Sequence, residues 1–197
     1  MTKQKIEYLF QKIIKEATIG NADQLKILIK QSNSIDCSKA LIISAVNGHT
    51  ECVKLLIPLS NPKTNDSEAL RLASSSGHTE CVKLLIPVSD PKAKNNYALR
   101  WASSDGYDEC VNLLIPVSDA KNNNSIALES AAVRNNINCV KLLLPYSDIS
   151  KWDINNWKYI SSDMQNFIQS YYSKKSLTEN VLINNSKISK TKKIHKI

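Results

Sequence analysis

Apolar and polar positions alternate along this chain with the period of an amphipathic helix, and the whole pattern returns every 29 residues. Each unit has two short apolar-periodic segments, such as Leu99 and Ala102 followed by Cys110, Val111 and Leu114. Residues three and four apart share a helix face, so each segment predicts a helix with one buried side. The four units read KALIISAVNGHTECVKLLIP from 39, EALRLASSSGHTECVKLLIP from 68, YALRWASSDGYDECVNLLIP from 97 and IALESAAVRNNINCVKLLLP from 126.

Glycine and proline predict where these helices end. The four glycines lie between the paired segments, where a left-handed residue ends the first helix: Gly20, Gly48, Gly77 and Gly106. Four of the six prolines follow the second segment, where the ring and the missing amide hydrogen stop a helix: Pro58, Pro87, Pro116 and Pro145. Thr50, Thr79 and Asp108 are expected to cap the second helix. The predicted fold is all-α, a repeat solenoid of stacked antiparallel helical hairpins.

The repeated stretch GHTEC suggests either a chemical site or packing. His49, Glu51 and Cys52 have the side chains of a metal site or an activated thiol. The histidine is replaced by Tyr107 and Asn136 in the later units, whereas the cysteine persists. We therefore interpret the cysteine as a small buried residue and expect no metal or catalytic residues here.

Signatures of catalysis are also missing from the rest of the sequence. It has no glycine-rich phosphate loop, no HExxH and no paired CxxC. The prediction is a protein that is not an enzyme and has no cofactor. Stacked helices lie about 8–10 Å apart, farther than a disulfide reaches, so the cysteines are expected to stay thiols in a reducing compartment.

Charge and hydropathy bear on localisation and partners. No run of 18 or more apolar residues occurs, and the start of the chain is charged throughout, so we expect neither a membrane span nor a secretory leader. Of the formal charge of +8, residues 173–197 carry +6, from seven lysines and Glu179. This basic tail, predicted to be disordered, is a solvated end, a nuclear-import signal or a non-specific nucleic-acid binder.

The repeated units resemble ankyrin repeats. The matching run in the third unit is Tyr97 to Ser103, then Gly106, Glu109, Cys110, Val111 and Leu113 to Ile115. The resemblance covers about residues 17–146. It is similar to arrays found in large DNA viruses and host-associated bacteria, which implies a cytoplasmic chain, or one in the cytoplasm or nucleus of a host cell.

Two departures from the family pattern stand out. The threonine-proline-leucine-histidine signature is reduced to an alanine-leucine pair, as in Ala98-Leu99, so the hydrogen bonds usually made there are expected to be missing. The unit has 29 residues instead of the family's 33. The connector loses the difference, and we expect the projecting finger to be trimmed to a tight turn.

The ends of the array differ from its middle. Residues 1–36 predict an N-terminal capping helix and a worn repeat, and residues 37–152 the four repeats. Residues 153–172 predict a C-terminal capping unit, since arrays need polar-faced ends. The basic tail follows at 173–197.

The resemblance implies a concave face lined by the first helices, which binds partners. On this face the expected contact residues are Leu72, Ser75, Ser76, Trp101, Ser104, Asp105, Ser130, Val133 and Arg134, with the charged column Arg71, Arg100 and Glu129. Trp101 is the preferred anchor, the alternative being that it packs on Leu72. The two arginines of the charged column would favour an acidic binding partner. The alternative is that Glu129 neutralises Arg100 within the chain.

The function implied is a non-catalytic protein-protein interaction module, a monomer that binds partner proteins through the concave surface. The alternative is a nucleic-acid-associated or nuclear-targeted adaptor that uses the basic tail.

Overall fold

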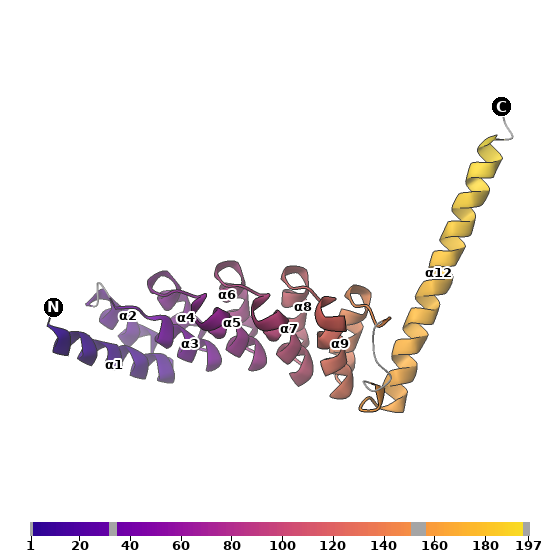
Figure 1. The fold of residues 1–197 in the computed structure, drawn as a ribbon. Coiled ribbons are helices and arrows are strands. Elements are labelled where there is room, and N and C mark those ends of the chain that lie inside the picture. The colour runs from indigo at the N-terminus through magenta and orange to yellow at the C-terminus, as the bar shows by residue number, and fades with distance from the viewer. Residues whose placement is uncertain (1, 32–34, 151–156, 195–197) are drawn as a thin grey trace. The chain divides into compact units, whose positions relative to one another are not determined.

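The computed structural model describes residues 2–31, 35–150 and 157–194, with side chains described outside 122–124 and 179–194. In these ranges the regular secondary structure is helical and there is no strand, which confirms the predicted all-α class. The chain divides into two compact units, Met1–Trp152 and Asp153–Ile197 (Figure 1).

The first unit is a series of helical hairpins. In chain order they are α1 (Lys3–Ile19) with α2 (Ala22–Lys30), α3 (Ser38–Val46) with α4 (Thr50–Leu56), α5 (Thr64–Ser75) with α6 (Thr79–Leu85), α7 (Ala93–Asp105) with α8 (Asp108–Leu114), and α9 (Asn122–Val133) with α10 (Ile137–Leu143). A short 3-10 turn follows the second helix in the last four hairpins: η1 (Ile57–Leu59), η2 (Ile86–Val88), η3 (Ile115–Val117) and η4 (Leu144–Tyr146).

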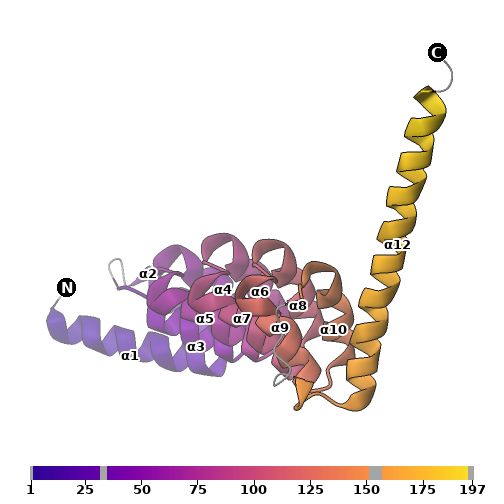
Figure 2. The ribbon, with the colours of Figure 1, turned by 45° about the vertical axis from the view of Figure 1, so that its right-hand side comes forward.

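The hairpins stack into two layers. Each first helix contacts the next first helix, from α1 through α3, α5 and α7 to α9, and each second helix contacts the next second helix, from α2 to α10 (Figure 2). Contacts therefore join neighbouring repeats, as expected of a solenoid.

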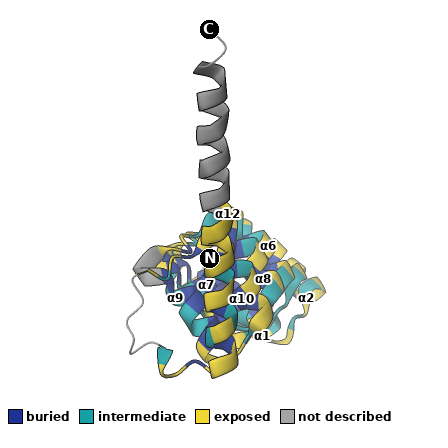
Figure 3. Cartoon of the chain, turned by 90° about the vertical axis from the view of Figure 1, so that its right-hand side faces the viewer, coloured by how far each residue is buried: buried dark blue, intermediate teal, exposed yellow. Residues whose placement is uncertain are grey.

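The core between the layers is built from columns of the repeat. The first helices contribute one fully buried leucine per unit: Leu41, Leu70, Leu99 and Leu128. The second helices add buried cysteine, valine and leucine, as in Cys110, Val111 and Leu114. Figure 3 shows the buried positions in dark blue among the packed helices. Each buried leucine contributes roughly 1.5–3 kcal/mol, so the columns hold the stack together.

The hairpin turns confirm the role predicted for glycine. Gly77 has φ +73°, and a Cβ there would lie 2.5 Å from Cδ1 of Tyr107 in the next repeat. The glycine therefore allows both the left-handed turn and the close approach of the following unit. In the last repeat Asn135 takes the glycine position with φ 59°.

The predicted capping role of Thr50, Thr79 and Asp108 is wrong. The second helices begin at these residues, and the preceding residue has no side-chain cap hydrogen bond. Instead, Oγ1 of Thr50 lies 3.7 Å from Sγ of Cys81, and Oγ1 of Thr79 lies 3.5 Å from Sγ of Cys110. These threonines link consecutive repeats.

The connectors contain hydrogen bonds that the sequence reading did not anticipate. A serine or asparagine near the start of each first helix accepts from a backbone amide 23 residues later, as Ser67 Oγ does from Asp90 (2.8 Å) and Asn96 Oδ1 from Asp119 (3.0 Å). Ser38 and Ser125 make the equivalent bond. These four hydrogen bonds tie each connector to the hairpin that precedes it. From the reduced threonine-proline-leucine-histidine signature, hydrogen bonds in this part of the repeat were expected to be missing.

The second unit contains the helix α12 (Ser162–Ile194). Nε2 of Gln165 donates to the carbonyls of Trp157 (2.7 Å) and Ile160 (2.8 Å) and holds its first turn. The boundary expected between residues 172 and 173 falls inside this helix, and residues 173–194 are helical where a disordered tail was predicted. Neither glycine nor proline follows Pro145 to interrupt it.

In the described part of the chain no helix has the length and apolarity needed to cross a bilayer.

Candidate functional site

The exposed side of α5, α7 and α9, hereafter the first-helix face, carries the predicted contact residues. None of these side chains belongs to the buried core: Leu72, Ser75, Ser76, Arg71, Arg100, Ser104, Glu129 and Ser130 are half-buried, and Trp101, Asp105, Val133 and Arg134 are exposed. Their repeat positions place them on the helix side opposite the core leucines. The face is therefore available in the first unit.

An aromatic pair lies at the centre of this face. Trp101, 39% exposed, stacks on Tyr97 one turn earlier in α7, with ring centroids 5.4 Å apart and planes inclined by 28°. The aromatic contact of Trp101 is thus within its own helix, and the alternative that Trp101 packs on Leu72 stays a prediction. Sequence reasoning missed Tyr97, although its i, i+4 spacing to Trp101 signals such a contact.

Arg71 holds this aromatic pair from the preceding repeat. Its guanidinium lies 4.9 Å from the centroid of Tyr97. Nε donates to the carbonyl of Asp66 (3.0 Å) and Nη2 to that of Asn65 (2.9 Å). Arg71 is therefore occupied by its own chain and fixes the ring by a cation–π contact.

Two adjoining hollows lie on this face, and Trp101 lines the smaller of them. The smaller, of about 110 Å³ and hereafter the arginine hollow, is lined by Arg100, Trp101, Ser104 and Ser130. The larger, of about 360 Å³ and hereafter the α9 hollow, is lined by Ser104, Ile126, Glu129, Ser130, Val133 and Arg134. The small side chains of Ser104 and Ser130 border both hollows, which are therefore contiguous across α7 and α9.

The structure thus brings the α7 and α9 candidates together, except for the exposed Asp105, and leaves the α5 candidates apart. Oγ of Ser75 donates to the carbonyl of Leu72 within α5 (3.1 Å). Leu72, Ser75 and Ser76 border neither hollow. Arg71 connects α5 to the aromatic pair by its contact with the Tyr97 ring.

Two charges of opposite sign on this face remain unpaired. Nε of Arg100 is shielded from solvent and has no hydrogen-bond partner among the described residues. The salt bridges of the described side chains do not include one between Arg100 and Glu129, so the alternative in which Glu129 neutralises Arg100 is wrong. Burial raises the pKa of the Glu129 carboxyl.

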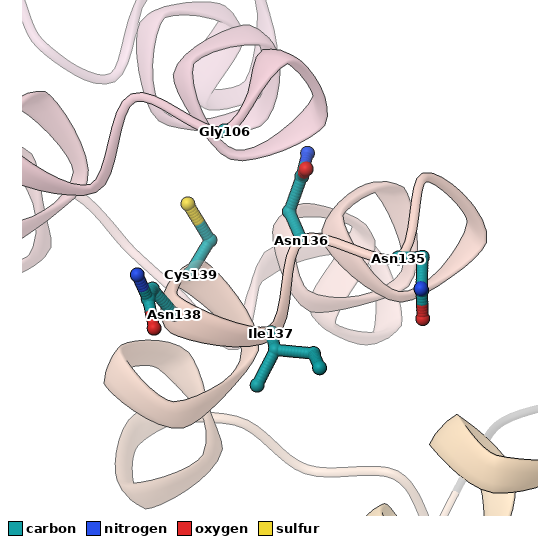
Figure 4. A pocket seen from close by; sticks show the side chains of 6 residues that line it. All are labelled: Gly106, Asn135, Asn136, Ile137, Asn138 and Cys139. Carbon is teal, nitrogen blue, oxygen red and sulfur yellow. The ribbon is translucent and has the colours of Figure 1, made fainter.

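The histidines of the GHTEC stretch have structural contacts. Nε2 of His49 lies 3.0 Å from the carbonyl of Thr18, and Nε2 of His78 lies 3.0 Å from that of Val46, each in the preceding repeat. In the last repeat Asn136 takes this place and extends toward Gly106 (Figure 4). Its Nδ2 donates to the carbonyls of Ser103 and Ser104. This position therefore joins repeats by side chain-to-backbone hydrogen bonds.

The cysteines are free and buried. Burial raises the pKa of each thiol, that of Cys139 to about 11. A buried thiol with a raised pKa is a poor nucleophile and a poor metal ligand. Within the part of the chain that the structure describes, no three side chains suited to a metal ion lie together.

Stacked hairpins with a fixed period and an exposed first-helix face define a helical repeat solenoid. A family model of ankyrin repeats in three copies matches residues 13–95 and 87–155. This match spans more than half of the sequence, and the chain belongs to the ankyrin-repeat family. Proteins of this family are generally protein-protein interaction modules and typically non-catalytic. A comparison with curated proteins gave no match.

Proposed function

We propose that this chain binds one or more partner proteins through the first-helix face and catalyses no reaction. The observation that carries the proposal is the aromatic pair Tyr97–Trp101, which Arg71 contacts and whose Trp101 ring lines the arginine hollow. Large amphipathic rings beside a pocket are the side chains that dominate interface energies. Because Arg71 and Tyr97 already order Trp101, little side-chain entropy is lost on association.

The test begins with affinity capture of partners from cell extract by the full chain, followed by mass spectrometry. Each captured protein is then purified, and its dissociation constant is measured for the parent chain and for Trp101→Ala. We expect the substitution to weaken binding by about 2 kcal/mol or more, roughly thirtyfold, as for the anchor of an interface.

Tyr146→Ala is the matched control, since Tyr146 is an aromatic residue of η4 that is 52% exposed and lies outside the first-helix face. It should leave partner binding unchanged, and both variants should melt like the parent. A partner that bound Trp101→Ala as tightly as the parent would show that this face is not the binding surface.

A second candidate function is a nucleic-acid-associated or nuclear-targeted adaptor that uses residues 173–197. The observation in its favour is the +6 charge of this segment, against a total of +8. Such binding is electrostatic, insensitive to sequence and weakened by salt.

A further inference from the structure

Arg100 is the only one of the three arginines that is neither tied to its own chain nor well exposed. Arg71 is bonded to the carbonyls of Asn65 and Asp66, and Arg134 is exposed to water. Nε of Arg100, by contrast, reaches neither water nor a hydrogen-bond partner among the described residues. The salt bridges of the described side chains do not include Arg100 either, so its charge is left for a ligand of opposite sign to neutralise.

The surroundings of Arg100 set the size and chemistry of what fits. The arginine hollow is small, about 110 Å³, with the Trp101 ring and two serine side chains as its other walls. The planar guanidinium presents parallel donors that match a carboxylate, and the Arg–carboxylate pair is among the strongest charge-assisted contacts. The arginine hollow therefore suits one carboxylate group.

The adjoining α9 hollow suits a different side chain. It is larger, about 360 Å³, and Ile126 and Val133 provide apolar walls. Because Ser104 and Ser130 border both hollows, neighbouring side chains of one peptide can occupy the two together.

We infer that the first-helix face recognises an acidic segment of the partner protein, whose carboxylate binds Arg100 while a neighbouring apolar side chain enters the α9 hollow. This inference rests on the proposed function and names the partner's chemistry. The occupant is a peptide segment with aspartate or glutamate next to an aliphatic or aromatic residue.

Glu129 is the competing feature, because its carboxylate would attract a basic segment instead. Glu129 is half-buried and lines the α9 hollow, but not the arginine hollow. Burial raises the pKa of its carboxyl, whereas an arginine keeps its charge. Because Arg100 lines the arginine hollow and Glu129 does not, a group bound there meets the charge of Arg100, and the geometry favours an acidic partner.

The experiment uses two displayed libraries of random peptides that differ at one central position, glutamate in one and glutamine in the other. The full chain is the bait. We expect enrichment from the glutamate library, with an apolar residue beside the fixed acid. The selected peptides should bind Arg100→Gln at least about tenfold more weakly than the parent.

Lys83→Gln is the matched control for the loss of one positive charge, because Lys83 is exposed on α6 and borders neither hollow. It should change the affinity by less than about twofold, as expected for a solvated charge. Glu129→Gln should bind the acidic peptides as tightly as the parent, or a few-fold more tightly, since it removes a nearby like charge.

Equal enrichment from the glutamine library, or undiminished binding to Arg100→Gln, would overturn the acidic-segment inference. Peptides that lost binding to Trp101→Ala but not to Arg100→Gln would retain the proposed function and refute only this inference. Selection of basic peptides that lose binding to Glu129→Gln would likewise overturn it, in favour of the opposite charge. Peptides indifferent to Trp101→Ala would refute both.

Discussion

At the scale of single residues, the first-helix face keeps charges that a purely structural surface would have paired. Arg100 and Glu129 occupy the same position of adjacent repeats, and α7 packs against α9, yet no ion pair joins them within the described residues. Buried polar groups usually find partners. Unpaired groups on an exposed face therefore indicate where a ligand supplies the missing contact.

Glu129 gives a prediction for stability against pH. Burial raises its carboxyl pKa in the folded chain above the ordinary value of 4.5, so the folded state binds this proton more tightly than the unfolded state does. The resulting stabilisation is fully present below the unfolded-state pKa and is lost as the pH rises through the folded-state pKa. Glu129→Gln cannot carry the charge, so we expect a higher Tm at neutral pH and a difference that shrinks below about pH 4.5.

Glu109→Gln is the control, because Glu109 is exposed in the first turn of α8, where a negative charge is favourable. It should not raise the Tm at neutral pH. Thermal melts of the three chains across the acidic range decide the matter. A lower Tm for Glu129→Gln at neutral pH would mean that the ionised carboxylate is stabilising.

At the scale of elements, the hairpin turn has a conformation that only particular residues tolerate. Gly77 is left-handed, and its missing side chain leaves room for the Tyr107 ring of the next repeat. Gly77→Ala adds a left-handed penalty of roughly 1–2 kcal/mol and a clash with that ring. We expect a clear loss of stability, measured as a lower urea midpoint.

Ser76→Ala is the neighbouring control for the glycine substitution. Ser76 has φ −105°, a conformation that alanine adopts freely, so its midpoint should stay close to that of the parent. Equal urea midpoints for Gly77→Ala and Ser76→Ala would contradict this prediction. They would mean that neither the left-handed conformation nor the close contact with Tyr107 requires a glycine.

The hairpins could be read from the sequence because their signals are local and repeat four times. The helix-ending glycines, the prolines in the 3-10 turns and the buried column of Leu99 all follow from periodicity and backbone chemistry. For the same reason the predicted contact residues lie outside the buried core, and their role in binding stays a prediction. What could not be read depends on three-dimensional distances, and the failure of Arg100 to reach Glu129 is the clearest case.

Other features that were not predicted leave a recognisable pattern in the sequence. The serine or asparagine at Ser67 and Asn96 recurs at the repeat interval, but its partner amide lies 23 residues away and only the fold makes the pairing evident. The threonines were predicted to be caps because the helix was expected to start one residue later than it does. The stacking of Tyr97 on Trp101 was signalled by their spacing and overlooked.

At the scale of the whole molecule, charge is divided unevenly along the chain. Residues 173–197 carry +6 of the formal +8, leaving +2 for everything before them. The first-helix face belongs to the first unit and the basic segment to the second. Substitutions in one unit can therefore remove partner binding or nucleic-acid binding without changing the residues proposed for the other.

Neutralising the seven lysines of residues 173–197 to glutamine separates the two candidate functions and keeps the length of the chain. We expect the parent to retain duplex DNA at low salt, with log K falling against log salt by about 0.9 per phosphate contacted. The neutralised chain should lose that retention and still bind its protein partners, with the same sensitivity to Trp101→Ala. DNA retention and partner affinity are measured on both chains over a salt series. A parent chain that failed to bind DNA even at low salt would eliminate the nucleic-acid function. If the neutralised chain also lost its protein partners, part of the interface would lie in the basic segment and not on the first-helix face.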